Sequence, residues 1–221
     1  MSTREYGQFC GLARAAELLA QRWTLLILRD LLVGSRRYSD LAAGLPGISS
    51  NLLSTRLKEL EHNGLIRREV HSGSNRSIVY ALTQRGAELQ PALDALSRWG
   101  AAGLRVPRQG EVITDAALAS ALRVAASGAN TLSRRQTYTV RIGEAVAHAL
   151  VDDGVVEVNT GGHPGSDLVL TGGQEFRDLL AGTLDSQTAI SDGVIALEGD
   201  PALLADFMSI FVVPYSQADK T

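Results

Sequence analysis

Residues 45–66 read LPGISSNLLSTRLKELEHNGLI, a turn followed by an amphipathic helical pattern. The Pro-Gly pair near the start indicates the turn. After it, three leucines share one face of a helix with 3.6 residues per turn, which predicts a helix over residues 50–63. A shorter helical pattern over residues 39–43 precedes the turn, and two short helices joined by a tight turn are a candidate helix-turn-helix. The three leucines are Leu53, Leu57 and Leu60.

The sequence around this motif predicts further helices and a hairpin. The pattern over residues 23–33 is apolar almost all round, which indicates a core helix. Further on, two strand-like runs enclose the polar segment 72–76, which suits the tip of a wing. Thr83 is expected to cap a last helix, and the apolar stripe of this helix, which includes Trp99, is typical of a helix that pairs two subunits. The expected elements are helices over residues 11–20, 23–33 and 83–104 and strands over residues 65–71 and 77–83.

Composition and charge predict two domains. Residues 105–110 follow a helical pattern and contain both proline and glycine, which places a boundary there. Residues 1–105 carry 14 basic and 9 acidic residues, a net charge of +5, whereas residues 106–221 carry 7 and 15, a net charge of −8. This asymmetry indicates that only the first half meets nucleic acid. The predicted domains are a winged helix-turn-helix domain for DNA binding and dimerisation at residues 1–105 and a smaller domain at residues 111–215.

The second half alternates between strand patterns and short helical patterns. Its first helix is expected to end at a cap at Gly128. A turn at residues 152–154 joins two of the strands, and Pro201 is expected to start the last helix. This order predicts an α+β fold with a twisted, mainly antiparallel sheet covered by helices. The expected strands lie at residues 138–142, 146–151, 155–159 and 194–198, and the helices before the last one at residues 115–126, 176–181 and 187–190.

Several classes of protein are excluded by what the sequence lacks. No apolar run approaches the roughly 18 to 20 residues needed to cross a bilayer, and the N-terminus lacks the layout of a signal peptide. A single cysteine allows no internal disulfide, and no ligand set for zinc is present. There is no P-loop, no dinucleotide fingerprint and no nucleophile elbow, and His148 and His163 have no evident catalytic partner. We expect a cytoplasmic protein that makes no use of a membrane, a metal or a cofactor and is not an enzyme.

The predicted helix over residues 50–63 has a polar face opposite its leucines. This face offers the donors and acceptors that base edges and phosphates require. The free N–H groups of the first turn can approach a phosphate or enter the major groove. Asn51 and Thr55 are the expected base contacts, whereas Arg56 lies nearer the apolar side and is expected to pair with a carboxylate such as Glu59 or one on a neighbouring helix. The predicted DNA contacts of this helix and its cap are Ser49, Ser50, Asn51, Ser54, Thr55 and Lys58.

Four further residues are predicted to contact DNA from outside this helix. Arg36 and Arg37 precede the first helix of the motif, and Asn75 and Arg76 lie at the predicted wing tip. A cation at these positions can neutralise a phosphate or enter the minor groove. The alternative for each arginine is an ordinary solvated side chain.

A series of motifs runs through the first half in a fixed order: CGLA (residues 10–13), WTLLILRDL (23–31), RYSDL (37–41), LPGIS (45–49), LSTRLKELE (53–61), GLI (64–66), YALT (80–83) and WG (99–100). Their order and spacing resemble the HxlR-type winged-helix regulators of bacteria, over nearly all of residues 9–101. The resemblance implies a homodimer that binds a palindromic operator in double-stranded DNA. It also implies one recognition helix for each half-site, with the wings alongside.

Cys10 matches the N-terminal cysteine through which some members of that family sense oxidants or electrophiles. The resemblance therefore implies a redox role for Cys10. The sequence itself favours a small buried hydrophobic residue that packs the first helix, because no lysine or histidine lies beside the thiol to lower its pKa.

Three motifs of the second half, DLVL (residues 167–170), FRDLLAG (176–182) and GVIALEGD (193–200), resemble domains of the sterol-carrier-protein type. The resemblance implies a twisted sheet whose helices enclose an apolar tunnel, with the closing helix at a pocket for an apolar effector. The alternative is a plain core helix. The predicted pocket residues are Leu203, Leu204, Phe207, Met208 and Phe211.

These patterns favour a dimeric regulator, a repressor, whose DNA binding responds to an apolar small molecule in the second domain. Two alternatives stay open. One is a regulator controlled by oxidation of Cys10, with a second domain that is only structural. The other is a lipid carrier or an interaction module.

Overall fold

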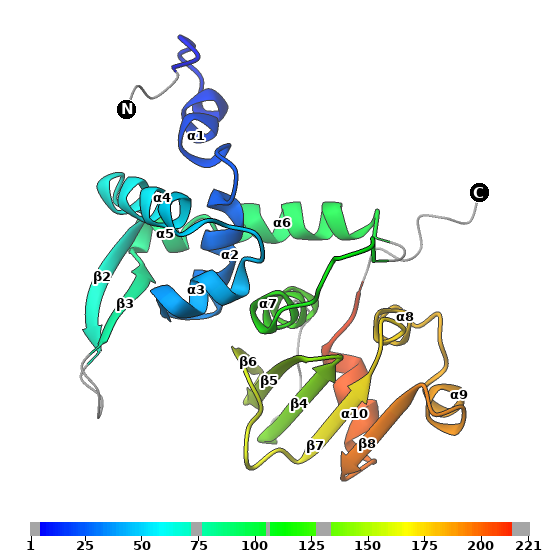
Figure 1. Cartoon of the computed structure of the whole chain (residues 1–221). Coiled ribbons are helices and arrows are strands. Elements are labelled where there is room, and N and C mark those ends of the chain that lie inside the picture. The colour runs from blue at the N-terminus through cyan, green and yellow to red at the C-terminus, as the bar shows by residue number, and fades with distance from the viewer. Residues whose placement is uncertain (1–4, 72–76, 105–106, 127–133, 214–221) are drawn as a thin grey trace. The chain divides into compact units, whose positions relative to one another are not determined.

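The computed structural model describes residues 5–71, 77–104, 107–126 and 134–213. The chain forms two compact units, Met1–Leu93 and Asp94–Thr221. The first contains helices and a three-stranded antiparallel sheet, and the second contains a five-stranded mixed sheet with helices (Figure 1). The predicted α+β class is therefore confirmed, with a winged helix-turn-helix in the N-terminal half.

Helices α3 and α4 form the helix-turn-helix of the N-terminal unit. α3 spans Tyr38–Gly44 and α4 spans Ser50–His62, and the Ile48 N–H donates to the Leu45 carbonyl at 3.1 Å in the turn between them. Strands β2 and β3 pair as the predicted hairpin, and β1 pairs with the other edge of β3. The other elements are α1 (Gly11–Leu19), α2 (Thr24–Val33), β1 (Arg36–Arg37), β2 (Ile66–His71), β3 (Ser77–Leu82) and α5 (Gln84–Ala87).

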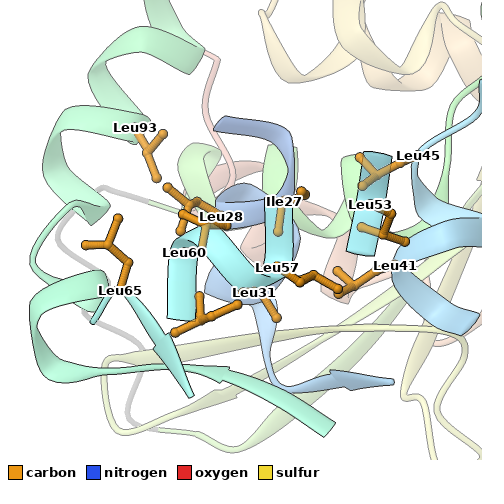
Figure 2. Close-up of a cluster of buried hydrophobic side chains, with 11 residues drawn as sticks. Ile27, Leu28, Leu31, Leu41, Leu45, Leu53, Leu57, Leu60, Leu65 and Leu93 are labelled. Carbon is orange, nitrogen blue, oxygen red and sulfur yellow. The ribbon is translucent and has the colours of Figure 1, made fainter. Parts of the chain in front are cut away.

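The core of this unit lies between α2 and α4 (Figure 2). The three leucines of the sequence pattern, Leu53, Leu57 and Leu60, are at most 3% exposed. They join Ile27 and Leu28 of α2, which are fully buried, so the prediction of a core helix there is confirmed. Burial of each such side chain contributes roughly 1.5 to 3 kcal/mol. The apolar face of α4 is thereby held inward, which leaves its polar face outward.

The prediction of one last helix over residues 83–104 is wrong. α5 ends at Ala87, and α6 spans Gln90–Ala101. Pro91 gives the reason, because its ring nitrogen carries no N–H for the carbonyl of Ala87 and its ring crowds that carbonyl in a continuous helix. Thr83 caps α5 as predicted, since its hydroxyl oxygen accepts a hydrogen bond from the Gly86 N–H at 3.1 Å.

The sheet of the C-terminal unit has the strand order β6-β5-β4-β7-β8 (Figure 1). β4 and β7 are parallel, and the other neighbours are antiparallel. The predicted turn between β5 and β6 contains Asp153 and Gly154 at φ of 44° and 79°, the left-handed conformation of a type I′ hairpin turn. The elements are α7 (Asp115–Ala125), β4 (Gln136–Ile142), β5 (Ala145–Asp152), β6 (Val155–Thr160), β7 (Leu168–Gly172), α8 (Phe176–Leu180), α9 (Ser186–Ser191), β8 (Ile195–Gly199) and α10 (Leu203–Ile210).

Aromatic rings fix α10 to this sheet. The ring of Tyr138 on β4 lies 5.2 Å from the ring of Phe207 on α10, measured between centroids. Phe176 and Phe211 lie 6.1 and 4.6 Å from the same Phe207 ring. α7 packs on β5 and β6, and Gly128, its predicted cap, lies outside the described residues. The core of this unit is therefore closed by α7 and α10.

Candidate functional site

The first turn of α4 is fixed from two sides. Ser49 caps the helix, and its hydroxyl oxygen accepts a hydrogen bond from the Leu52 N–H at 3.3 Å. The Tyr38 hydroxyl of α3 donates to the Ser50 carbonyl at 2.9 Å. Sequence reasoning missed Tyr38, whose only signal is its place in the motif RYSDL. The start of α4 is therefore held in one orientation while Ser49 and Ser50 stay exposed.

Asn51 and Lys58 are exposed on the face of α4 opposite its leucines. Neither side chain has a hydrogen bond or an ion pair with any residue in the described part of the chain. The amide of Asn51 offers both a donor and an acceptor, and the ammonium of Lys58 offers a positive charge. These groups suit a base edge and a phosphate, respectively.

The hydroxyl groups of Ser54 and Thr55 already donate within the protein. Thr55 Oγ1 donates to the carbonyl of Asn51 at 2.9 Å, and Ser54 Oγ donates to the Tyr38 hydroxyl oxygen at 3.5 Å. Each hydroxyl oxygen retains a lone pair that can accept from a base or from water. Of the two residues predicted as base contacts, Asn51 is therefore the one whose side chain can both donate and accept.

Arg56 is tied to its own unit instead of facing outward. Its guanidinium forms an ion pair with Glu59, and Nη2 donates to Gln21 Oε1 at 3.3 Å. The prediction that Arg56 pairs with the carboxylate of Glu59 is confirmed. Arg56 therefore stabilises α4 and the segment that contains Gln21.

Arg36 and Arg37 form the edge strand β1, and their surroundings differ. Arg37 is exposed, whereas Arg36 is half-buried. Burial raises the pKa of the Asp30 carboxyl, and the positive charges of Arg29 and Arg36 act in the opposite direction. Asp30 is only 1% exposed and pairs with Arg29 at 2.7 Å. Arg37 is therefore the better placed of the two for a phosphate.

The wing contributes exposed arginines of its own. Arg67 and Arg68 of β2 are exposed, but each pairs with a glutamate, at 2.6 and 2.8 Å. Asn75 and Arg76, the predicted contacts at the wing tip, lie outside the described residues. The described candidate surface is therefore α4 with its cap and Arg37.

The N-terminal half matches a family model described as HxlR-like helix-turn-helix, over residues 18–106. The transcriptional regulator sll1512 of Synechocystis sp. is 40% identical over 96 residues, which cover 43% of this chain and 71% of that protein. This chain belongs to the HxlR-like family. The transcriptional regulator YvaP of Bacillus subtilis is 43% identical over 86 residues, which cover 39% of this chain and 80% of that protein.

The family membership gives the general function. As an HxlR-like protein, the chain is a DNA-binding helix-turn-helix transcriptional regulator and not an enzyme, which confirms both expectations. The reduced form of YodB from Bacillus subtilis, a solved structure, shares 30% identity and covers 46% of this chain and 100% of that chain, with a TM-score of 0.39. The family model ends at residue 106, so it identifies the first half. Across the described residues, no helix is both long and apolar enough to span a bilayer.

Cys10 of this HxlR-like chain is exposed and immediately precedes α1. The interpretation of Cys10 as a buried hydrophobic residue is therefore wrong. The physical reason is that α1 buries only Ala13 among its own residues, so the start of this helix reaches no core that could cover the thiol.

A hollow of about 750 Å³ lies between α9, β8 and α10 of the C-terminal unit. This volume is in the range of small-molecule sites. Among the described residues that line it, none is charged, and the polar side chains are Ser186 and Gln187. Of the predicted pocket residues, Leu204 and Met208 line the hollow, and the others are buried. Those buried residues are Leu203, Phe207 and Phe211.

His148 and His163 lie together, a pair that no local sequence pattern predicts. Their ring centroids are 5.4 Å apart. His148 Nδ1 hydrogen-bonds the Gly161 carbonyl at 2.9 Å, and the Gly165 N–H donates to His163 Nδ1 at 3.2 Å. Among the described residues, no group of three or more histidine, cysteine or acidic side chains could hold a metal ion. The pair thus joins β5 to the loop that follows β6.

Proposed function

We propose that this chain is a dimeric repressor that binds a palindromic operator in double-stranded DNA through α4 of each protomer. The observation that carries the proposal is the outward face of α4, where Asn51 and Lys58 have free polar groups beside a rigidly held first turn. A palindromic operator has two half-sites, and each protomer of a dimer contacts one of them.

The proposed contacts divide into base readers and phosphate contacts. Asn51 and Thr55 read base edges in the major groove, where the side-chain amide of asparagine matches adenine. The remaining groups fix the register by contacting phosphates. They are Arg36, Arg37, Ser49, Ser50, Ser54, Lys58, Asn75 and Arg76.

Exposed apolar side chains support the dimer. Phe9 and Leu12 near α1 are 108% and 79% exposed, and Leu96 and Trp99 on α6 are 51% and 80% exposed. A contiguous patch of exposed apolar side chains marks a protein–protein interface, and Leu96 and Trp99 are neighbours at i and i+3 on α6. We propose that they meet a second copy of the chain and that residues 1–105 form the DNA-binding and dimerisation domain.

The hollow in the C-terminal unit supports regulation by an apolar small molecule. The described residues of its walls are mostly apolar and uncharged, so an uncharged ligand would bury its surface there without leaving an ion unpaired. We propose residues 111–215 as a ligand-binding domain of the sterol-carrier type. A ligand that binds one arrangement of the dimer better than another shifts the affinity for the operator.

The exposure of Cys10 favours a second candidate for the signal. An accessible thiol can be oxidised, and a change at the start of α1 would act beside the exposed Phe9 and Leu12. In this version the C-terminal unit is only structural. A response to oxidants that disappears in a Cys10→Ser variant would support this candidate over the apolar ligand.

A gel-shift titration with the DNA upstream of the chain's own gene tests the proposed function. The Asn51→Ala/Thr55→Ala variant is expected to weaken specific binding by about tenfold or more, because it removes the groups that read bases. The control is Gln84→Ala/Gln90→Ala, which changes two exposed polar side chains outside α4. Equal affinities of both variants would refute α4 as the reading helix.

A further inference from the structure

Arg123 of α7 holds the middle of α6. Its Nη1 and Nη2 donate to the two carboxylate oxygens of Asp94, at 3.0 and 2.6 Å. The two side chains are 15% and 13% exposed, so water screens the pair weakly. Two parallel hydrogen bonds also fix the relative orientation of the groups, which a single contact does not do. The pair therefore sets the position of α6 in the C-terminal unit.

Arg177 of α8 holds the end of the same helix. Its guanidinium donates to the carbonyls of Ala101, at 3.2 Å, and of Leu104. The last carbonyls of a helix have no partner within the helix, and a cation beside them also interacts favourably with the helix dipole. Two arginines from two different helices therefore act on one segment, residues 94–104.

The face of α6 that the two arginines contact is opposite its exposed apolar face. At 100° per residue, Asp94 and Ala101 lie within about 20° of each other, whereas Leu96 and Trp99 lie roughly 140° to 200° away from Asp94. Leu96 and Trp99 are 51% and 80% exposed. The two arginines therefore hold α6 from the side opposite the face that we assign to the second copy of the chain.

The wall of the hollow is connected to both helices that carry these arginines. Leu204 and Met208 of α10 line the hollow. The segment that follows α10 donates to the carboxyl ends of both helices, from the Val212 N–H to Ala125 of α7 at 3.2 Å and from the Val213 N–H to Leu180 of α8 at 3.1 Å. Figure 1 shows α10 as the last helix of the chain, next to the sheet.

We propose that Arg123 and Arg177 are positioning residues that couple occupation of the hollow to the dimer face of α6. A ligand that displaces α10 moves α7 and α8 through the hydrogen bonds of residues 212 and 213, and the two arginines move α6. Neither arginine touches the ligand, the second copy or the DNA. The proposal rests on the proposed function, and it names the element through which the ligand acts.

A covalent probe can fill the hollow, so the experiment does not require a known ligand. Cys10 is the single cysteine of the chain, so a Cys10→Ser/Met208→Cys parent has one thiol, which lies in the wall of the hollow. N-phenylmaleimide adds this thiol across its double bond and leaves an uncharged aromatic group there. The dissociation constant of the dimer, measured by sedimentation, and the affinity for the upstream DNA are compared before and after labelling.

The label is expected to change both constants by about tenfold in the parent, the scale of ordinary allosteric coupling. Arg177→Met and Arg123→Met in the same parent are expected to reduce this change to less than about twofold, while each labelled chain still melts cooperatively. The charge-swapped Asp94→Arg/Arg123→Asp chain restores an ion pair and is expected to recover the response. The control is Arg141→Met, which removes a half-buried arginine of the same unit that pairs with Glu198 at 3.2 Å.

The outcomes separate this inference from the proposed function. A label effect of equal size in the parent and in the Arg177→Met and Arg123→Met chains would overturn the coupling, and so would a label without effect in the parent. Specific binding of the unlabelled parent to the upstream DNA leaves the proposed function standing in either case. Absence of that binding counts against the proposed function, while the dimer constants still decide the coupling.

Discussion

At the scale of single residues, Gly86 shows how a fold can depend on a missing side chain. A Cβ atom at this position would lie 2.0 Å from the Leu65 carbonyl oxygen and 3.1 Å from Cδ2 of Leu82. The distance of 2.0 Å is far shorter than a van der Waals contact. The Leu65 oxygen belongs to the backbone, which cannot rotate out of the way as a side chain can. Only glycine therefore lets α5 pack on the start of the wing.

Gly86→Ala is expected to lower the free energy of unfolding by about 3 kcal/mol or more, because the two backbones must separate. Urea denaturation followed by circular dichroism measures the change. The matched control is Gly100→Ala on α6, where a Cβ atom meets nothing within 4 Å and alanine is expected to be neutral or slightly stabilising. Equal stabilities of the two variants would contradict the packing described for Gly86.

Residue roles differ in how far the sequence could reveal them. Asn51, Arg56 and the buried leucines follow from their positions on one helical wheel, which is a local property. Tyr38 contacts Ser50 across a turn, and Arg177 contacts Ala101 from 76 residues away. Contacts of this kind depend on how elements pack, and no local pattern encodes them.

At the scale of elements, the sequence predicted most helices and strands because their apolar spacing is regular. The break between α5 and α6 was missed, since the apolar stripe continues through it and Pro91 interrupts only the backbone hydrogen bonds. Strand β7 was not predicted as a strand either. β7 pairs in parallel with β4, which is distant from it in the sequence. This pairing depends on how the whole sheet assembles, and no local pattern encodes it. The hollow was assigned to α10 alone, whereas α9 and β8 form its other walls.

The apolar face of α6 allows a prediction about assembly. Leu96→Ser/Trp99→Ser is expected to raise the dissociation constant of the dimer by about tenfold or more, because two large side chains leave the interface. Both residues are exposed within the protomer, so the melting temperature of the monomer should change little. Analytical ultracentrifugation measures the constant, with the exposed Ser97→Ala change on another face of the same helix as control. An unchanged dimer would place the interface elsewhere.

At the scale of the whole molecule, the two halves carry opposite charge, +5 in residues 1–105 and −8 in residues 106–221. A polyanion such as DNA attracts the first half and repels the second. The division restricts productive encounters to the half that contains α4. Among the basic side chains of the first half, Lys58, which we propose as a phosphate contact, has no ion-pair partner in the described part of the chain.

Salt dependence therefore tests the role of Lys58 as a phosphate contact. Binding to a phosphate releases counterions, so Lys58→Gln is expected to reduce the slope of log affinity against log salt by about one and to weaken all sequences alike. Asn51→Ala should instead leave the slope unchanged and reduce the preference for the operator. Arg141→Gln, a loss of the same charge in the acidic half, is the control. If Lys58→Gln and Arg141→Gln gave the same slope as the parent, Lys58 would contact no phosphate, and the electrostatic part of binding would come from the other basic residues of the first half.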